Sequence, residues 1–249
     1  HGEEEIADRF ERTRALMKGL APGAGFAAYT DATSMGQALK LRKAGEPLLH
    51  GVPGKRKPLG FVEDNAVPVE RLAEFVQEFR RILEKHGTRA AFWAHASVGV
   101  LHVRPLLDMR DEADREHMEQ IAVEVADLSR SVGGVMSGEH GDGRVRGPLL
   151  KRYFGPELMR AFREVKELFD PQYLLNPGNI VPVGEAPAPI ESIHESTRVR
   201  PHGRNLDTPH VETYFNYADE GGLDHAVELC NGSGVCRKKQ GGTMCPSYM

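Results

Sequence analysis

The feature of this sequence that most constrains its fold is an amphipathic segment that begins at Pro68 and ends at Gly87. Proline is favoured in the first turn of a helix and glycine directly after the last turn, so these two residues mark the ends of a predicted helix. The apolar residues between them recur at steps of three and four, which places them on one helical face: Leu72, Phe75, Val76, Phe79 and Leu83. Such a face must be buried against another element.

Further segments have the apolar patterns of regular elements. In chain order they are a helix at 6–18, a strand at 27–30, a strand at 58–68, strands at 90–95 and 98–107, a helix at 110–131, a strand at 132–140 and a helix at 156–169. Strands and helices are mixed without the strict alternation of a doubly wound fold. The pattern therefore predicts an α+β fold, with an antiparallel, ferredoxin-like sheet that carries helices on one face.

The bulk properties limit the classes of function. The chain has 249 residues, 40% of them hydrophobic, which is enough for one sizeable domain and a smaller appendage. With 36 acidic and 32 basic residues, the composition shows no excess of positive charge of the kind that binds nucleic acid or an anionic membrane. No apolar run approaches the roughly 20 residues of a membrane-spanning helix, and the N-terminus has no signal-peptide pattern. We therefore expect a cytoplasmic protein without a nucleic-acid partner or a transmembrane segment.

The composition changes near the middle of the C-terminal half. From 182 to 210 the chain is rich in Pro, Glu, Arg and His and lacks apolar periodicity, as a linker does. We therefore expect a domain at 1–181, a linker at 182–210 and a second segment at 211–249. Because the chain opens on His1 instead of Met and stops at Met249, we expect both ends to be cuts through a longer protein.

Titratable side chains gather at predicted strand ends. His95 closes one strand and His102 lies in the next, and the short Ser-Val-Gly connection lets both imidazoles reach one point. Glu139 and His140 follow a further strand, in the glycine-rich run SGEHGDGR, where a ligand can approach the backbone closely. Two histidines and a carboxylate suit a divalent metal, zinc above all, with positions left for a substrate oxygen. The alternative is that each histidine is only hydrogen-bonded at a strand end, and the sequence leaves both open.

An arginine is expected beside these ligands. Arg104 follows His102 by two residues and so returns to the same face of the strand. Its guanidinium fork matches the geometry of a carboxylate. We therefore expect Arg104 to bind the carboxylate of a substrate.

Four motifs together resemble a known family. FVEDNAVP, HASVGVLHVRP, GEHGDGR and LLNPGNI occur in the same order and at comparable spacing in the C-terminal domain of FAD-linked oxidases. This group includes D-lactate dehydrogenase, the flavoprotein subunit of glycolate oxidase and D-2-hydroxyglutarate dehydrogenase. The resemblance covers residues 1–181 and implies metal ligands at His95, His102 and Glu139. It places His140 next to the flavin as a base or hydrogen-bond partner.

The resemblance implies further binding residues. The segment TDATSMGQALKLRKAG is similar to the stretch that supplies a substrate-binding arginine, here Arg42, for which a solvated helix charge is the alternative. Asn176 would contact the flavin, and a turn position before Pro177 is its plainer role. The resemblance also implies that the FAD is bound mainly by a preceding domain, because the FAD domain of this family normally precedes this region; in agreement, the chain has no G-x-G-x-x-G fingerprint. One departure bears on substrate preference: many relatives have GHxGDGNxH where this chain has AHASVGVLH, as we expect of larger members fused to iron–sulfur modules.

The cysteines lie close together near the C-terminus. The chain has three cysteines, Cys230, Cys236 and Cys245. An odd number of cysteines argues against a disulfide framework. Thiolates at this short spacing, with a terminal Cys-Pro, indicate a ferredoxin-type cluster, with a zinc site and inert thiols as the alternatives. Because Ser233 stands where such a run usually has a cysteine, these residues cannot complete a four-thiolate site alone. The resemblance implies that they begin a two-cluster 4Fe–4S module.

The reaction that the resemblance implies is the oxidation of a small D-2-hydroxy acid. FAD would take the α-hydrogen as hydride, the metal would lower the pKa of the hydroxyl, and His140 would take its proton. Electrons would leave through the 4Fe–4S module to a one-electron acceptor protein or a quinone. Two other classes stay open: a metal-dependent hydrolase that uses the histidine and carboxylate set without flavin, and an electron-transfer adaptor that uses only the cysteines. The oligomeric state is open, a homo-oligomer included.

Overall fold

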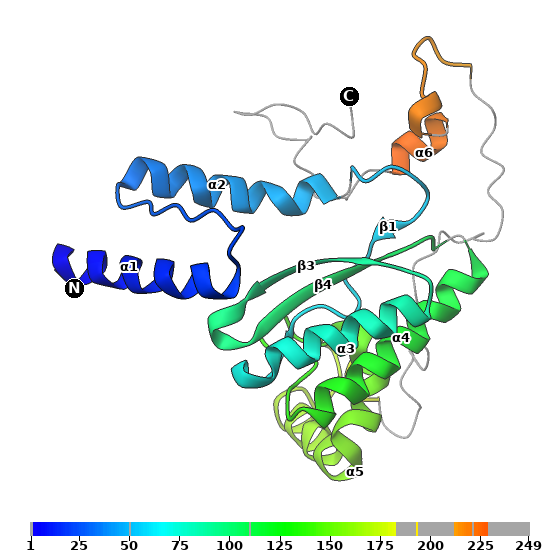
Figure 1. Cartoon of the computed structure of the whole chain (residues 1–249). Coiled ribbons are helices and arrows are strands. Elements are labelled where there is room, and N and C mark those ends of the chain that lie inside the picture. The colour runs from blue at the N-terminus through cyan, green and yellow to red at the C-terminus, as the bar shows by residue number, and fades with distance from the viewer. Residues whose placement is uncertain are drawn as a thin grey trace. The chain divides into compact units, whose positions relative to one another are not determined.

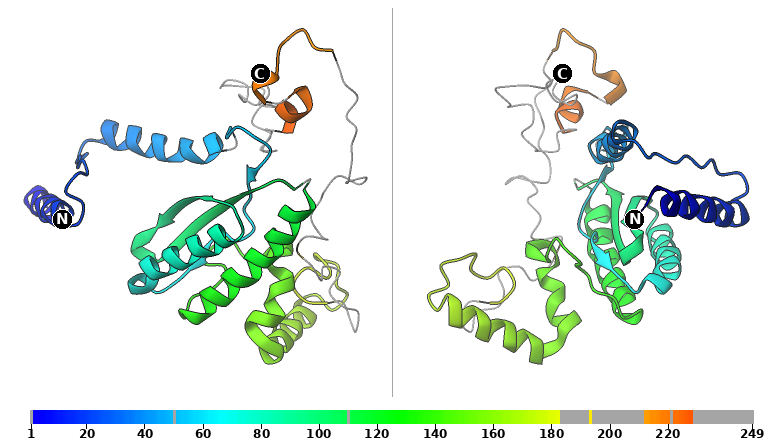
Figure 2. Two further views of the ribbon diagram at one scale, coloured as in Figure 1. Left: turned by 45° about the vertical axis from the view of Figure 1, so that its right-hand side comes forward. Right: turned by 90° about the vertical axis from the view of Figure 1, so that its left-hand side faces the viewer.

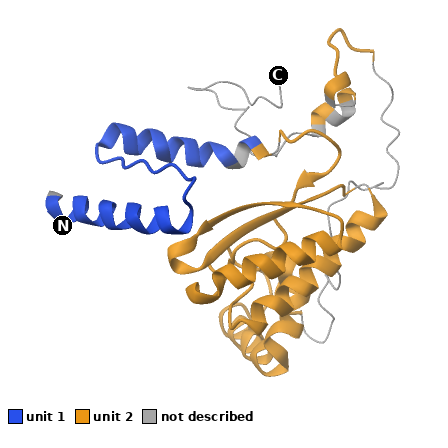
Figure 3. Cartoon of the chain, in the orientation of Figure 1, with its two compact units in different colours: residues 1–48 blue, residues 49–249 orange. Residues whose placement is uncertain are grey.

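The computed structural model of the chain describes residues 2–49, 51–109, 111–182, 193, 212–220 and 222–228. Contacts group the chain into two compact units, residues 1–48 and residues 49–249 (Figure 3). The predicted domain at 1–181 thus contains one complete unit and the larger part of a second. The boundaries at 181 and 210 remain predictions.

The first unit consists of two helices. These are α1 (Glu3–Leu20) and α2 (Ala32–Leu49), joined by a segment without strands. The helix predicted at 6–18 is confirmed and is longer at both ends, whereas the strand predicted at 27–30 is wrong. Phe26 from this connection packs edge-on against Phe10 of α1, with ring centroids 6.4 Å apart. The Arg14 guanidinium covers the same Phe26 ring.

The second unit is built around an antiparallel sheet whose central strand is β4 (Val100–Leu107). Strand β3 (Ala90–His95) pairs with β4 over its whole length, from Ala90 opposite Pro105 to His95 opposite Val100 (Figure 1). Two short strands, β1 (Lys57–Pro58) and β2 (Asn65–Ala66), pair with opposite ends of β4. The long strand predicted at 58–68 is therefore two short ones, whereas the strands predicted at 90–95 and 98–107 are confirmed.

A tight connection joins β3 to β4. The 3-10 turn Ala96–Val98 leads to Gly99, whose φ of 74° lies in the left-handed region. A Cβ at this glycine would lie 1.9 Å from the backbone oxygen of Val67. Glycine is therefore required here both for its conformation and for the close approach of the neighbouring chain.

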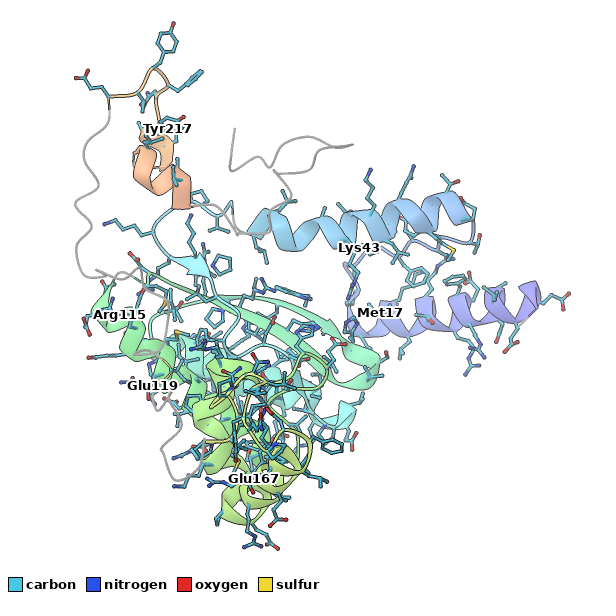
Figure 4. All side chains as sticks on the ribbon, turned by 180° about the vertical axis from the view of Figure 1, so that it is seen from behind. Met17, Lys43, Arg115, Glu119, Glu167 and Tyr217 are labelled. Carbon is cyan, nitrogen blue, oxygen red and sulfur yellow. The ribbon has the colours of Figure 1, made fainter. Side chains whose placement is uncertain are left out.

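Helices cover one face of the sheet (Figure 2). After the 3-10 turn Val69–Arg71, α3 (Leu72–Lys85) lies beside α4 (Glu112–Ser131), and α5 (Gly143–Phe169) packs against α4. Three residues of the apolar stripe predicted for α3 are buried, Phe75, Phe79 and Leu83, and the other two, Leu72 and Val76, are partly buried against the core. Phe79 meets Phe92 of β3 with ring centroids 6.0 Å apart. The opposing core residues of β4 are Leu101, Val103 and Leu107. Figure 4 shows the side chains of these elements, with Arg115 and Glu119 labelled on α4 and Glu167 on α5. The predicted α+β class with an antiparallel sheet is confirmed.

Two elements differ from their sequence patterns. The strand predicted at 132–140 forms only a single bridge, between Val135 and Ala66, because glycines bend it and bring it against β2. At Gly134, for example, a Cβ would lie 2.6 Å from the Ala66 oxygen. Helix α5 starts well before the predicted 156–169 and is interrupted at Gly155, whose φ of 76° and ψ of 174° are not helical.

Beyond the sheet domain, the structure describes the 3-10 turn Ala218–Glu220 and α6 (Leu223–Glu228). Nearly all of the predicted linker lies outside the described residues. So do Cys230, Cys236 and Cys245, whose cluster remains a prediction. In the part of the chain that is described, no helix has the length and apolarity needed to cross a membrane.

Candidate metal and substrate site

The site lies on the face of the sheet opposite the helices. Side chains alternate between the two faces along a strand, so the core residues of β4 leave His102 and Arg104 on the other face. The β3 register places Trp93 opposite His102 and Ala91 opposite Arg104. The alternation also brings His95 to this face. Because no helix of the core layer covers it, the sheet can present polar groups here.

His102 forms the buried base of the site, with only 4% of its surface exposed. Its ring stacks on that of His140, with centroids 5.1 Å apart and an angle of 17°, and meets the His95 ring edge-on at 5.4 Å. Its Nδ1 has no hydrogen-bond partner among the described residues, so ring packing holds its orientation. The side chains of His95, Glu139 and His140 are about half exposed, which leaves the site accessible.

Three imidazole nitrogens converge on one oxygen atom. The Nε2 atoms of His102, His140 and His95 lie 3.3, 3.6 and 3.7 Å from Glu139 Oε1. Two donors on one tetrahedral zinc ion, each about 2.0–2.1 Å from the metal, are about 3.4 Å apart. The separations therefore match those of ligands around a single cation, and this donor set fits the predicted zinc ion.

Asp64 is the second carboxylate of the cluster. A set of four potential ligand atoms lies within 4.8 Å of one another, one each from Asp64, His102, Glu139 and His140. This set does not include His95. The Asp64 oxygens are already engaged, however, because Oδ2 accepts hydrogen bonds from Ser137 Oγ at 2.6 Å, His140 N at 2.7 Å and Glu139 N at 3.0 Å. Asp64 therefore holds the Glu139–His140 backbone, and His95 is the more available ligand.

Two pKa shifts follow from this packing. Burial raises the pKa of the Asp64 carboxyl, but its hydrogen bonds from Ser137 and from the His140 and Glu139 amides act more strongly, so that its pKa lies below the ordinary value. Burial lowers the pKa of the His102 ring, and the negative charge of Glu63 opposes this only in part. A neutral imidazole is the form that binds a metal ion.

Arg104 lies beside the histidines and is held from two sides. Its Nη2 is 3.5 Å from Glu63 Oε2, and its guanidinium carbon is 5.2 Å from the centre of the Trp93 ring. Glu63 Oε1 is in turn 3.3 Å from His140 Nδ1. The site thus combines several carboxylates, which suit a cation, with the Arg104 guanidinium, which suits the carboxylate of a ligand.

Arg146 ties the backbone of the site together from below. Its buried guanidinium donates to the carbonyl oxygens of Glu63, Met136 and Gly141. These carbonyls belong to the two chain segments that carry the acidic residues. Arg146 therefore fixes the segment directly before β2 relative to the glycine-rich loop that precedes α5.

The structure brings five predicted site residues into one cluster: His95, His102, Arg104, Glu139 and His140. Their roles as ligands, base and substrate anchor remain predictions. Arg42 is exposed on α2 in the first unit, and its substrate role is likewise a prediction. Asn176 has a left-handed φ of 45°, and its carbonyl accepts a hydrogen bond from Asn179 N, as expected for a turn residue. Its flavin contact remains a prediction.

Glu63, Asp64 and Arg146 were not singled out from the sequence. The available signal was the acidic pair inside FVEDNAVP, since two adjacent carboxylates in an otherwise apolar run require partners when they are buried. Arg146 carried no comparable signal, because it lies in a run of charged and glycine residues.

Comparison with known proteins shows the family to which the chain belongs. The model of the C-terminal domain of FAD-linked oxidases matches residues 1–180, and the chain belongs to this family. Over 224 residues it is 35% identical to the D-2-hydroxyglutarate dehydrogenase of Haemophilus influenzae, which covers 90% of this chain and 21% of that protein. Over 208 residues it is 37% identical to the enzyme of the same name from Escherichia coli, covering 83% of this chain and 19% of that protein.

A relative that matches a shorter part of the chain is the D-lactate dehydrogenase of Archaeoglobus fulgidus. It is 35% identical over 128 residues, which is 51% of this chain and 28% of that protein. The chain spans about a fifth of the length of the two D-2-hydroxyglutarate dehydrogenases. The recognition from the four sequence motifs is confirmed at the level of the family.

Proposed function

We propose that this chain is part of a flavin-dependent dehydrogenase that oxidises a small D-2-hydroxy acid, of the D-2-hydroxyglutarate, D-lactate or glycolate class. The observation that carries the proposal is the convergence of three imidazole nitrogens on Glu139 Oε1, directly beside an oriented guanidinium. A 2-hydroxy acid has a hydroxyl and a carboxylate on adjacent carbons. The site offers complementary groups to both: a cation position and Arg104.

Each side chain has a task in this proposal. His95, His102 and Glu139 hold the metal, and Arg104 binds the substrate carboxylate through charge-assisted hydrogen bonds. His140 accepts the hydroxyl proton at Nε2, the nitrogen that faces Glu139. When bound, a divalent cation supplies positive charge to the substrate oxygens and FAD supplies the acceptor for two electrons. Asp64 holds the backbone of Glu139 and His140 so that their side chains keep this arrangement.

The proposal includes an electron path beyond the described residues. FAD would be bound mainly by a part of the protein outside this chain, with Asn176 as a contact. Cys230, Cys236 and Cys245 would be the first ligands of a two-cluster 4Fe–4S module that passes electrons singly to an acceptor protein or a quinone. Support comes from the cysteine spacing and from similarity to much longer proteins.

The test uses the complete flavoprotein that contains this chain, loaded with FAD and zinc. Under anaerobic conditions, D-2-hydroxyglutarate, D-lactate and glycolate are added in turn, and bleaching of the oxidised flavin spectrum is followed. We expect at least one of them to bleach the flavin, and the L enantiomer of a chiral substrate to bleach it far more slowly. If none of the three acids bleaches the flavin, the proposal is wrong.

A pair of histidine variants separates this proposal from one based on the cysteines alone. His102→Ala removes the buried imidazole and should abolish bleaching together with zinc binding. His117→Ala is the matched control, since His117 lies on α4 beside Asp114, outside the cluster. Equal activity of the two variants would contradict a role for the cluster. Hydrolysis without flavin, dependent on zinc alone, would favour the hydrolase alternative.

A further inference from the structure

Glu63 contacts two functional side chains at the same time. One carboxylate oxygen, Oε1, lies 3.3 Å from His140 Nδ1, and the other, Oε2, lies 3.5 Å from Arg104 Nη2. The Glu63 side chain is only 16% exposed, and its own backbone carbonyl is held by Arg146. A carboxylate fixed in this way is well placed to orient both of its neighbours.

We propose that Glu63 is a positioning residue that couples the proton-accepting His140 to the carboxylate-binding Arg104, and so sets how a 2-hydroxy acid lies in the site. This inference rests on the proposed function. It concerns a residue that contacts neither the metal position nor the hydroxyl of the substrate, and that acts through two side chains that do.

The contact with His140 determines which ring nitrogen carries the proton. An ionised carboxylate can only accept hydrogen bonds, so His140 Nδ1 must donate to Glu63. In a neutral imidazole the other nitrogen then has a lone pair, and His140 Nε2 is the one that faces Glu139. Glu63 thereby selects the tautomer in which the nitrogen inside the site can take a proton.

The contact with Arg104 determines the direction of its guanidinium. The Glu63 carboxylate holds the edge of the group, and the Trp93 ring, 5.2 Å away, lies along its face. A planar fork held at one edge and one face has little rotational freedom left. A carboxylate bound by Arg104 therefore arrives at a fixed orientation relative to His140, because both groups are tied to the same residue.

Glu63 is distinct from the metal ligands in this geometry. Its Oε1 faces Nδ1 of His140, whereas Glu139 is faced by the Nε2 atoms of all three histidines: the proposed ligands His95 and His102 and the proton acceptor His140. Loss of Glu63 should therefore leave metal binding intact while it impairs turnover. Impaired turnover with unchanged metal content is therefore the expected result. It distinguishes a positioning role from a role as a metal ligand or in folding alone.

The experiment compares Glu63→Gln with Glu124→Gln in the complete flavoprotein. Glu124 is a matched control because its carboxylate also joins a histidine to a cation, at 2.8 Å from His86 Nε2 and 2.9 Å from Lys85 Nζ, but in the helical layer. We expect Glu63→Gln to lower kcat/KM for the 2-hydroxy acid about 10- to 100-fold, the equivalent of one lost hydrogen bond to a charged group. Zinc content by elemental analysis and flavin content should equal those of the wild type, and Glu124→Gln should retain wild-type kinetics.

A double-mutant cycle tests whether Glu63 acts through Arg104. In an Arg104→Ala background, the added Glu63→Gln change should lower kcat/KM by a clearly smaller factor than in the wild type. Equal factors in both backgrounds, or kinetics of Glu63→Gln equal to those of Glu124→Gln, would overturn the proposal. Loss of zinc in Glu63→Gln would also overturn it.

A second variant covers the case in which Glu63→Gln does not fold. Glu63→Asp keeps the charge but shortens the side chain by one methylene, so that it cannot reach both partners. Reduced turnover with wild-type zinc content supports the proposal, and wild-type turnover overturns it. A wild-type flavoprotein that no 2-hydroxy acid bleaches would instead show that the proposed function itself is wrong, and with it this inference.

Discussion

Asp64→Asn should destabilise the protein more than any exposed carboxylate change. The Asp64 carboxylate is fully buried and accepts hydrogen bonds from Ser137 Oγ and from the amides of Glu139 and His140. Asparagine has nearly the same shape and, like aspartate, tolerates the left-handed φ of 71° found here. The substitution therefore tests the hydrogen bonds rather than the backbone.

The expected magnitude follows from these three bonds. A hydrogen bond to a charged acceptor contributes about 1.5–3 kcal/mol, and an Asn amide nitrogen turned toward these donors would leave some of them without an acceptor. Removing the buried charge also removes part of its desolvation cost. We therefore expect the free energy of unfolding to fall by about 2–4 kcal/mol, less than the sum of the three bonds.

The assay is urea denaturation followed by circular dichroism and by the fluorescence of Trp93, which is the one tryptophan of the chain and lies on the site face. Asp127→Asn is the matched control, because Asp127 pairs with Arg152 on the exposed surface and such pairs contribute about 0–1 kcal/mol. A loss for Asp64→Asn that lies within about 0.5 kcal/mol of the control would refute the reasoning.

Three further changes should alter stability in ways that unfolding experiments can measure. Phe79→Ala removes a fully buried ring from the core and should cost about 3–5 kcal/mol, whereas a cost below about 1 kcal/mol would contradict its central position. Gly99→Ala forces a left-handed φ and a clash with the Val67 oxygen, so we expect a loss of at least about 2 kcal/mol, and no change in the urea midpoint would count against it. Asp170 has a pKa lowered to about 2, first through its hydrogen bond with Lys166, so it stabilises the fold above its unfolded-state pKa and loses this effect as pH falls toward 2. The gap in stability between wild type and Asp170→Asn should therefore be widest near neutral pH and should shrink below about pH 4, and a constant gap would contradict this.

The helices and strands of the sheet domain were predictable where the apolar residues of a long segment recur at one constant spacing. In α3 the apolar residues alone define the buried face, and in β3 and β4 the short glycine connection leaves only an antiparallel pairing. The apolar pattern predicted the wrong element where close packing between two chain segments determines the backbone conformation. Residues 132–140 have the apolar content of a strand, but glycines there let the chain approach β2 more closely than a ladder would permit.

The site shows the same division. Sequence alone indicated His95, His102, Glu139 and Arg104, because residue type and a two-residue step along a strand are local properties. It could not indicate that the carboxylates of Glu63 and Asp64, which are adjacent in the chain, bind different partners. Glu63 contacts the Arg104 side chain, whereas Asp64 accepts a hydrogen bond from a backbone amide. A side chain's partners depend on which distant segments the fold brings within hydrogen-bonding distance. The sequence therefore determined the chemistry available to this protein, and tertiary structure decided which group orients which, because hydrogen bonds and ion pairs act over only a few ångströms.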